Sequence, residues 1–150
     1  EANMEVLDPE HSGIDIFDEN WKIYSRNSGM TGHKIGSNAV VENSMITDGC
    51  RIRGTVKHSV LFAGVKVAEG AVVEDAVVMG KTVIKAGAVV EHCIVAENVV
   101  IGENAVVGSM PKGEEHGVAT IGSGITIGKG AKIGPNAMVN KNVEDGEEQW

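Results

Sequence analysis

Aromatic residues are scarce in this sequence: Phe, Trp and Tyr make up only 3% of its 150 residues, although 42% are hydrophobic. A core built around large rings is therefore not available. The apolar content is mostly Val, Ile and Ala, whose side chains favour strands. Proline occurs three times and glycine 20 times. This composition predicts a narrow interior formed by short strands.

Other classes of residue and segment are also missing. No apolar run reaches the eighteen residues of a membrane span, and no signal peptide is visible. The two cysteines fit neither a metal motif nor a disulfide framework. A net charge of −8 disfavours nucleic acid and anionic membranes as partners. These absences predict a reduced, cytoplasmic protein without a metal site. The sequence does not begin with Met, so we expect it to be part of a longer chain.

Residues 55–108 nearly match themselves when the sequence is shifted by seventeen positions. The aliphatic residues that recur are spaced by five, six and six residues, three times over, and the last ones are spaced by six. No helix has such a period, whereas three short strands joined by corners do. The recurring residues are Ile35, Val41, Ile46, Ile52, Val56, Leu61, Val67, Val73, Val78, Ile84, Val90, Val95, Ile101, Val107, Ile121, Ile127, Ile133 and Val139.

Two further columns support this interpretation. A small residue usually stands two positions before each recurring aliphatic, on the same inward side of the strand. Gly or Asn usually stands three positions after it, where a corner needs a positive φ. Hexapeptide repeats of this kind resemble the left-handed parallel β-helix family. We therefore expect an all-β fold of about six coils over residues 35–143, with a loop excursion at 109–117 and an acidic tail at 144–150.

Residues 1–34 do not follow the repeat, and they contain three of the five aromatic residues, Phe17, Trp21 and Tyr24. A narrow prism has little room for these rings, so we expect an irregular linker. Two interpretations stay open. The linker covers part of the prism, or it packs against a domain outside this sequence.

The sequence is similar to bacterial glucose-1-phosphate adenylyltransferases (ADP-glucose pyrophosphorylases). The resemblance extends to about Val107 and is carried by "EANMEVLD", "IDIFDENWKIYS" and "TGHKIGSNAVVENSMITDGCRIRGTVKHSVLFAGVKV". Its most specific parts are Phe17–Tyr24 and Gly54–Val65. The glycine-rich nucleotide loop, sugar-phosphate lysine and magnesium-binding aspartates of that family are not in this sequence, and residues 109–117 do not match it.

This resemblance implies that residues 1–34 follow a nucleotidyltransferase domain and that the chain is the regulatory and oligomerisation domain of such an enzyme. The parent reaction joins ATP and glucose 1-phosphate into ADP-glucose and pyrophosphate, with Mg²⁺ in the catalytic domain, for glycogen synthesis. The implied partners are that domain, further copies in a tetramer and a phosphorylated effector. No cofactor is expected in this chain. Two alternatives stay open: a free-standing hexapeptide acyltransferase and a purely structural spacer.

The residues beside each recurring aliphatic should point outward, and they give each face of the prism its character. Face two, which carries Ile46, Leu61, Val78 and Val95, has an outward surface that is almost entirely apolar. Such a patch predicts an interface with another chain, the catalytic domain or the linker. The predicted interface residues are Met45, Val60, Phe62, Val77, Met79 and Ile94.

Face three, which carries Ile52, Val67, Ile84 and Ile101, is basic at one end. We interpret this cluster as an anion site for a phosphorylated effector, because the forked guanidinium group of Arg and the charged ammonium group of Lys both suit phosphate. An ordinary solvated face is the alternative. The candidate residues are Arg51, Arg53, Lys66 and Lys85.

No catalytic residue is assigned. His58, Asp75 and His92 occupy equivalent corners seventeen residues apart, so His–Asp pairing is expected with or without a function. His58 and His92 should lie ~9.6 Å apart, too far to share a metal ion. His116 in the loop is interpreted as solvated. Cys50 and Cys93 both take the small inward position and are predicted to be buried structural thiols.

Overall fold

The computed structural model describes residues 2–13, 15–16, 18–24, 27–113 and 117–150 of the chain. Phe17 and His116, singled out from the sequence, lie outside the described residues, as does part of the 109–117 excursion. The described N-terminal residues form one short helix, α1 (Ala2–Glu5), followed by turns and irregular chain up to β1. This agrees with the irregular linker predicted for residues 1–34.

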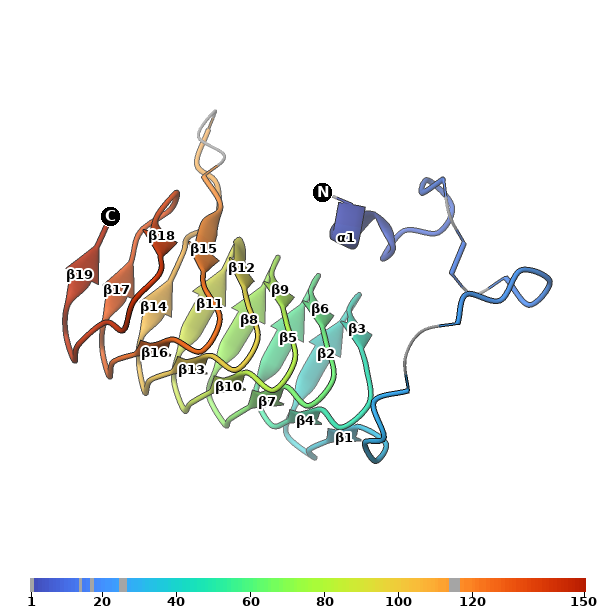
Figure 1. The fold of residues 1–150 in the computed structure, drawn as a ribbon, viewed down its shortest axis with the longest axis horizontal. Coiled ribbons are helices and arrows are strands. Elements are labelled where there is room, and N and C mark those ends of the chain that lie inside the picture. Colours follow the sequence, from blue (N-terminus) through green and yellow to red (C-terminus); the bar gives the residue numbers. More distant parts are fainter. Residues whose placement is uncertain (1, 14, 17, 25–26, 114–116) are drawn as a thin grey trace.

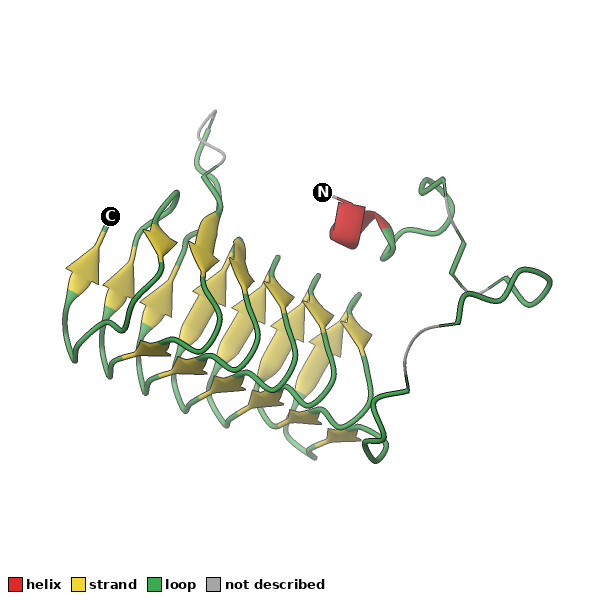
Figure 2. Cartoon of the chain, viewed as in Figure 1, coloured by secondary structure: helices red, strands yellow, loops and turns green. Residues whose placement is uncertain are grey.

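Short strands make up the rest of the chain and form three parallel sheets around a triangular prism (Figures 1 and 2). Sheet A is face three of the sequence analysis, sheet B is face one and sheet C is face two. Sheet A contains β1 (Lys34–Ile35), β4 (Arg51–Ile52), β7 (Lys66–Val67), β10 (Val83–Ile84), β13 (Val100–Ile101) and β16 (Thr126–Ile127). Sheet B contains β2 (Val40–Glu42), β5 (Thr55–Lys57), β8 (Val72–Glu74), β11 (Val89–Glu91), β14 (Val106–Val107), β17 (Lys132–Ile133) and β19 (Glu148–Gln149). Sheet C contains β3 (Met45–Ile46), β6 (Val60–Leu61), β9 (Val77–Val78), β12 (Cys93–Val95), β15 (Ala119–Ile121) and β18 (Met138–Val139).

Each strand pairs with the strand one coil before and after it, as a parallel β-helix requires. In the regular part of the prism the register is seventeen residues, so that Val73 pairs with Val56 and Val90 with Val73. The predicted left-handed hexapeptide β-helix is therefore confirmed. The rare handedness departs from the right-handed crossovers of ordinary parallel sheets.

The core is a column of stacked aliphatic side chains inside the prism. Every recurring aliphatic from Ile52 onward is buried, and the small residues two positions earlier are buried beside them. The first coil is the exception: Ile35 is 46% exposed, while Val41 and Ile46 are half-buried. One side of this coil has no further coil to pack against, so its inward residues keep contact with solvent.

Corners turn on single residues with positive φ. At the six-residue steps these are mostly the predicted Gly and Asn residues, and Lys81 takes the role at the one step where the pattern fails, with a φ of 60°. The five-residue steps between sheets B and C also turn in this way, at Asn43, His58, Asp75 and His92. Gly108 occupies the same corner in the next coil, where the excursion begins.

The C-terminal segment 144–150, predicted to be an acidic tail, continues the prism. Val143 bridges to Ile127, and β19 pairs with β17, which adds an incomplete seventh coil to the six complete ones. The corner rule applies here too, because Gly146 follows Val143 by three residues and has a φ of 71°. The acidic side chains face solvent, where Glu148 accepts a 2.7 Å hydrogen bond from Lys132 Nζ.

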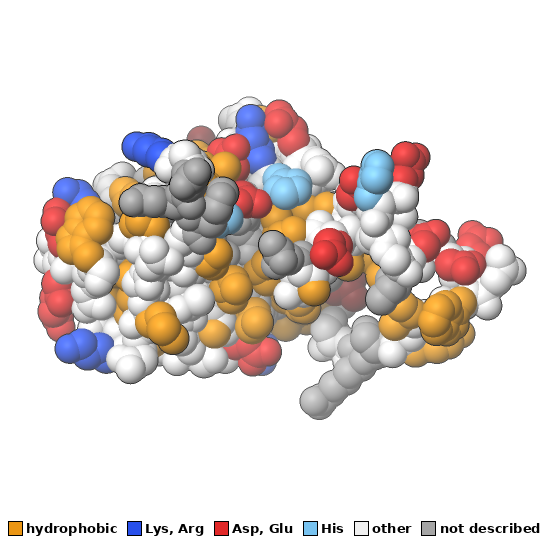
Figure 3. All heavy atoms as spheres, turned by 90° about the horizontal axis from the view of Figure 1, so that it is seen from above, with side chains coloured by type: hydrophobic (Ala, Val, Ile, Leu, Met, Phe, Trp, Pro, Cys, Tyr) orange, Lys and Arg blue, Asp and Glu red, His pale blue; other side chains and the backbone are white. Residues whose placement is uncertain are grey.

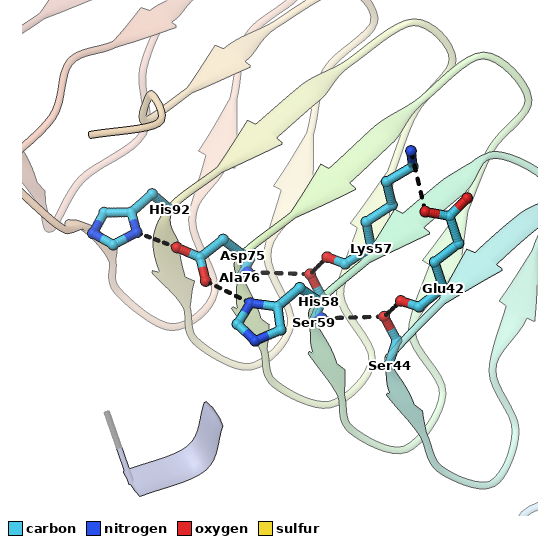
Figure 4. Close-up of polar contacts among 8 residues, drawn as sticks. All are labelled: Glu42, Ser44, Lys57, His58, Ser59, Asp75, Ala76 and His92. Carbon is cyan, nitrogen blue, oxygen red and sulfur yellow. Dashed lines mark hydrogen bonds and ion pairs between the residues drawn. The ribbon is translucent and has the colours of Figure 1, made fainter. Parts of the chain in front are cut away.

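The N-terminal segment lies beside sheet C. Figures 1 and 4 both place α1 near this side of the prism. The residues that follow α1, Val6, Leu7 and Pro9, line a groove with Val41, Asn43, Ser44 and Met45 at the corner between sheets B and C. Figure 3 shows hydrophobic side chains at the surface of the prism beside the N-terminal segment. The apolar face therefore has a partial cover made by the chain itself.

Candidate functional site

A row of three side chains joins neighbouring coils at the corner between sheets B and C (Figure 4). The Nδ1 atom of His58 lies 3.0 Å from one carboxylate oxygen of Asp75, and the Nδ1 atom of His92 hydrogen-bonds to the other. Because an ionised carboxylate can only accept, both imidazoles donate from Nδ1. Each ring then directs its Nε2 away from the carboxylate. We call these residues the corner row.

Backbone geometry explains why His and Asp stand in these positions. His58, Asp75 and His92 have φ values of 41°, 50° and 44°, in the left-handed region. Among residues other than glycine, Asn, Asp and His tolerate this region best. The corner therefore selects these residue types for backbone reasons, and the stacking of coils then brings them into hydrogen-bonding contact.

A hydroxyl ladder lies just inside the corner row (Figure 4). Ser59 N donates to Ser44 Oγ at 3.1 Å, and Ala76 N donates to Ser59 Oγ at 3.1 Å. The Ser59 hydroxyl itself donates to the carbonyl of Lys57. These bonds satisfy backbone N–H groups that would otherwise be buried without a partner. The ladder is part of the packing of the corner, and its hydroxyls are already used.

A second candidate site is a basic groove on sheet A, with a volume of about 420 Å³. Its rim carries all four predicted effector residues, Arg51, Arg53, Lys66 and Lys85, which are all exposed. Its floor is formed by small and aliphatic groups, and Glu103 stands at one end. The apolar side chains on this outer face are Ala68, Val83 and Ala86, whereas Val67 and Ile84, which also line the groove, have their side chains buried in the prism.

A fifth cation, Lys34, belongs to the same surface and was missed by the sequence reasoning. Lys34, Arg51 and Lys66 are in direct register on β1, β4 and β7. The signal was available, since Lys34 precedes the recurring Ile35 as Arg51 precedes Ile52. A larger hollow of about 810 Å³ at this end of the prism is lined by Lys34, Arg51 and Arg53, with Glu69 as its carboxylate.

The five cations of this surface are not neutralised by the protein. Among the described residues, none of the ion pairs involves Lys34, Arg51, Arg53, Lys66 or Lys85. Glu103, the carboxylate nearest the groove, is paired with Lys129 at 3.2 Å. Like charges directly opposite each other on neighbouring strands are destabilising, so the arrangement favours an incoming anion.

The six predicted interface residues divide into two groups. Val60 and Val77 point outward, as expected, yet only 4% and 6% of each is exposed. Met45 and Met79 are half-buried, whereas Phe62 and Ile94 are 40% and 39% exposed. An uncovered apolar strip thus remains on sheet C beside α1. Whether another chain or domain covers this strip stays a prediction.

Both cysteines are buried at the inward position, as predicted, and both are free thiols. Burial raises the pKa of the Cys50 thiol. Burial, together with the charges of Asp75 and Glu91, raises the pKa of Cys93 to about 12. Neither thiol is poised as a nucleophile at neutral pH, because the reactive form is the thiolate.

The part of the chain that the structure describes contains no cluster of metal ligands and no membrane-spanning helix. No group of three or more His, Cys, Asp or Glu side chains there is placed to hold a metal ion. The single short helix is far from the length needed to cross a bilayer.

Comparison with known proteins places the chain among hexapeptide-repeat proteins. A family model described as GlmU-like, C-terminal hexapeptide, matches residues 28–128, which are 101 of the 150 residues. The chain belongs to this family. A curated relative, the glucose-1-phosphate adenylyltransferase of Geobacillus stearothermophilus, is 46% identical over 74 residues, covering 49% of this chain. The chain spans only 19% of the length of that relative.

Solved structures support the fold. The acetyltransferase domain of PglB from Neisseria gonorrhoeae, in complex with acetyl coenzyme A, is 22% identical and superposes with a TM-score of 0.55. The match covers 79% of this chain and 54% of that one. The same domain in a second structure gives a TM-score of 0.56. At this identity the likeness concerns the fold alone.

Proposed function

We propose that this chain is the regulatory and oligomerisation domain of a glucose-1-phosphate adenylyltransferase and has no catalytic activity of its own. The observation that carries the proposal is the 46% identity over 74 residues to an enzyme of that name. In the parent enzyme, a nucleotidyltransferase domain with Mg²⁺ would form ADP-glucose and pyrophosphate in the cytoplasm. The β-helix would pack against that domain and against further copies, in a tetramer.

The basic groove supports the regulatory part of the proposal. Its four cations form no ion pair among the described residues and surround small apolar groups, which suits a phosphorylated small molecule. Arg51 and Arg53 offer planar guanidinium forks, whereas Lys66 and Lys85 act as point charges. Binding of an anion here relieves the repulsion between cations on successive coils, so the effector should also stabilise the fold.

Thermal unfolding of the chain with sugar bisphosphates and with AMP tests this role. A bound effector raises the free energy of unfolding by about 2.7 kcal/mol at one hundred times its Kd. We expect the shift to shrink when Arg51, Arg53, Lys66 or Lys85 is changed to Ala. Lys132→Ala, which removes a cation on sheet B that is paired with Glu148, is the matched control. An unchanged response in all four variants would show that the cluster is an ordinary solvated face.

A hexapeptide acyltransferase is the second candidate, and the corner row is the observation that favours it. Asp75 orients the ring of His92 and leaves its Nε2 available, which is the arrangement of a general base. None of the three grooves described above, however, includes a residue of the corner row. Incubation with ATP and glucose 1-phosphate should give no turnover under either proposal. Binding of acetyl coenzyme A by the chain would favour the acyltransferase.

A further inference from the structure

The linker exposes aromatic side chains in an acidic context. Trp21 is 74% exposed, Ile23 58% and Tyr24 87%. Asp18 and Glu19 lie just before Trp21 and Lys22 follows it, so residues 18–24 have two carboxylates and one ammonium, a net charge of −1. Figure 1 shows this part of the chain projecting beyond β1, away from the three sheets. We call Asp18–Tyr24 the arm. Large apolar groups held in solvent on a projecting segment are typical of a surface that is covered in an assembly.

The basic groove has the complementary chemistry. Its cations lack carboxylate partners among the described residues, and its floor consists of Ala68, Val83 and other apolar groups. Carboxylates of the arm would neutralise the rim, and the indole of Trp21 would cover the floor. A Lys beside an indole face also gains a cation–π interaction.

The spacing of the arm matches the spacing of the groove. Arg51 and Arg53 lie on the second coil, whereas Val83 and Lys85 lie two coils further along. Two coils correspond to ~9.6 Å. In the free chain residues 19–21 bend, and Asn20 N donates to Asp18 Oδ1 at 2.7 Å. If docking extends this bend, the three residues from Asp18 to Trp21 span ~10 Å. Asp18 and Glu19 can therefore contact the two arginines while Trp21 lies on Val83 beside Lys85.

We propose that the basic groove is a docking surface for the arm of a second copy of this chain. Two copies that exchange arms form a symmetric dimer in which each arm lies on the partner's sheet A. A second copy is favoured over the chain's own groove because the arm already projects away from its own prism. The inference deepens the oligomerisation role proposed above and rests on it. It also makes the arm a competitor of any anion that binds the groove.

A charge-swap experiment tests the exchange. One variant carries Asp18→Lys and Glu19→Lys, so that its arm is basic and its groove is unchanged. The other carries Arg53→Glu and Lys85→Glu, which cancel the excess positive charge of its groove, since Arg51 and Lys66 remain, and leave its arm unchanged. Glu19, Arg53 and Lys85 are exposed and Asp18 is half-buried, and circular dichroism verifies that the prism is intact. Sedimentation velocity should show each variant alone as less associated than the unaltered chain, and their equimolar mixture as more associated than either.

Trp21 supplies a second measurement. With Trp150→Phe in every protein, Trp21 is the only tryptophan. In the protein whose groove and arm are unaltered, its emission should shift to shorter wavelengths as the protein concentration rises. The same shift should occur when the two charge variants are mixed. Added salt should reverse the shift, because screening weakens exposed charge pairs. Lys112→Glu with Lys141→Glu changes the net charge equally, away from the groove, and should leave association intact.

Three outcomes would overturn the exchange. The mixture is no more associated than either variant alone; the Trp21 shift is independent of concentration, which would indicate docking in the chain's own groove; or all charge variants associate like the unaltered chain. In the last case, loss of association on Phe62→Ser with Met79→Ser would leave the oligomerisation role standing on sheet C while the arm exchange fails. If the unaltered chain does not associate at all, so that neither surface has a contact to lose, the oligomerisation role itself is contradicted.

Discussion

His58 and Asp75 stand seventeen residues apart in the sequence, yet the imidazole Nδ1 donates a 3.0 Å hydrogen bond to the carboxylate across one coil boundary. Asp75 accepts from His92 in the same way on its other side. The carboxylate therefore links three successive coils at one corner. It is 20% exposed, so solvent only partly screens these bonds.

Replacing Asp75 by Asn should destabilise the prism, because it removes the charge that both imidazoles share. Asn tolerates the φ of 50° at this corner, so the change isolates the side-chain bonds from backbone strain. Hydrogen bonds to charged groups contribute ~1.5–3 kcal/mol each, and partial exposure reduces this. Urea unfolding should show a loss of about 1–2 kcal/mol. Asn43→Asp, in the same corner without a histidine neighbour bonded to it, is the control.

Burial of a charge inside the prism should prevent folding. Val78 and Ile84 are both fully buried, so an Asp at either position is left unpaired in an apolar interior. We expect Ile84→Asp and Val78→Asp to lack the β circular dichroism of the native chain. The neighbouring Val83 lies in the same strand and faces the basic groove. Val83→Asp should fold, and a folded Ile84→Asp would contradict the inward assignment.

Two glycines with nearly the same φ distinguish backbone strain from steric overlap. Gly108 and Gly124 have φ values of 73° and 71°. A Cβ at Gly124 meets no atom within 4 Å, whereas one at Gly108 would overlap the carbonyl oxygen of Glu91. Gly124→Ala should cost ~1–2 kcal/mol of stability, the penalty of the left-handed backbone alone. Gly108→Ala should cost clearly more in the same denaturation assay, and equal losses would contradict the close approach of these two coils.

The Cys93 thiol should make the fold sensitive to alkaline pH. Its pKa is about 12 in the folded chain, raised from 9.0 by burial and by the charges of Asp75 and Glu91. Between these values the unfolded chain has released the proton and the folded chain retains it, so stability falls as pH rises. Three pKa units correspond to at most about 4 kcal/mol. Cys93→Ala should unfold with a shallower dependence on pH between 9 and 12, and an identical dependence would argue against the buried thiol.

The exposed strip on sheet C should mediate association without supporting the coil. Phe62 is 40% exposed and Met79 half-buried, and both follow an inward-facing residue and point outward. Changing both to Ser should leave the circular dichroism and the melting temperature nearly unchanged and weaken self-association in sedimentation. Val77→Ser is the contrasting variant: this side chain is 6% exposed, so its loss should lower stability instead. Unaltered association of the Phe62→Ser, Met79→Ser variant would move the contact to another face.

Sequence periodicity alone predicted the triangular prism, its inward aliphatic column and most of its corners. The reason is local: strand pleating fixes which side of a strand each residue faces, and corners need residues that accept a positive φ. The incomplete seventh coil was missed because Val143 follows Val139 by only four residues, a shorter step than the five or six of the repeat, although Gly146 keeps the corner three residues after it. The acidic composition of residues 144–150 concealed this, since outward side chains carry no information about whether a coil continues.

Tertiary structure decided the features that depend on segments outside the repeat. The pleat directs Val60 and Phe62 outward alike, yet the first is buried and the second is not. Which segment outside the repeat lies against an outward side chain depends on contacts between residues far apart in the sequence, which no period encodes. For the same reason, spacing placed His58, Asp75 and His92 at one corner, but only the packed coils showed that both rings bond to a single carboxylate.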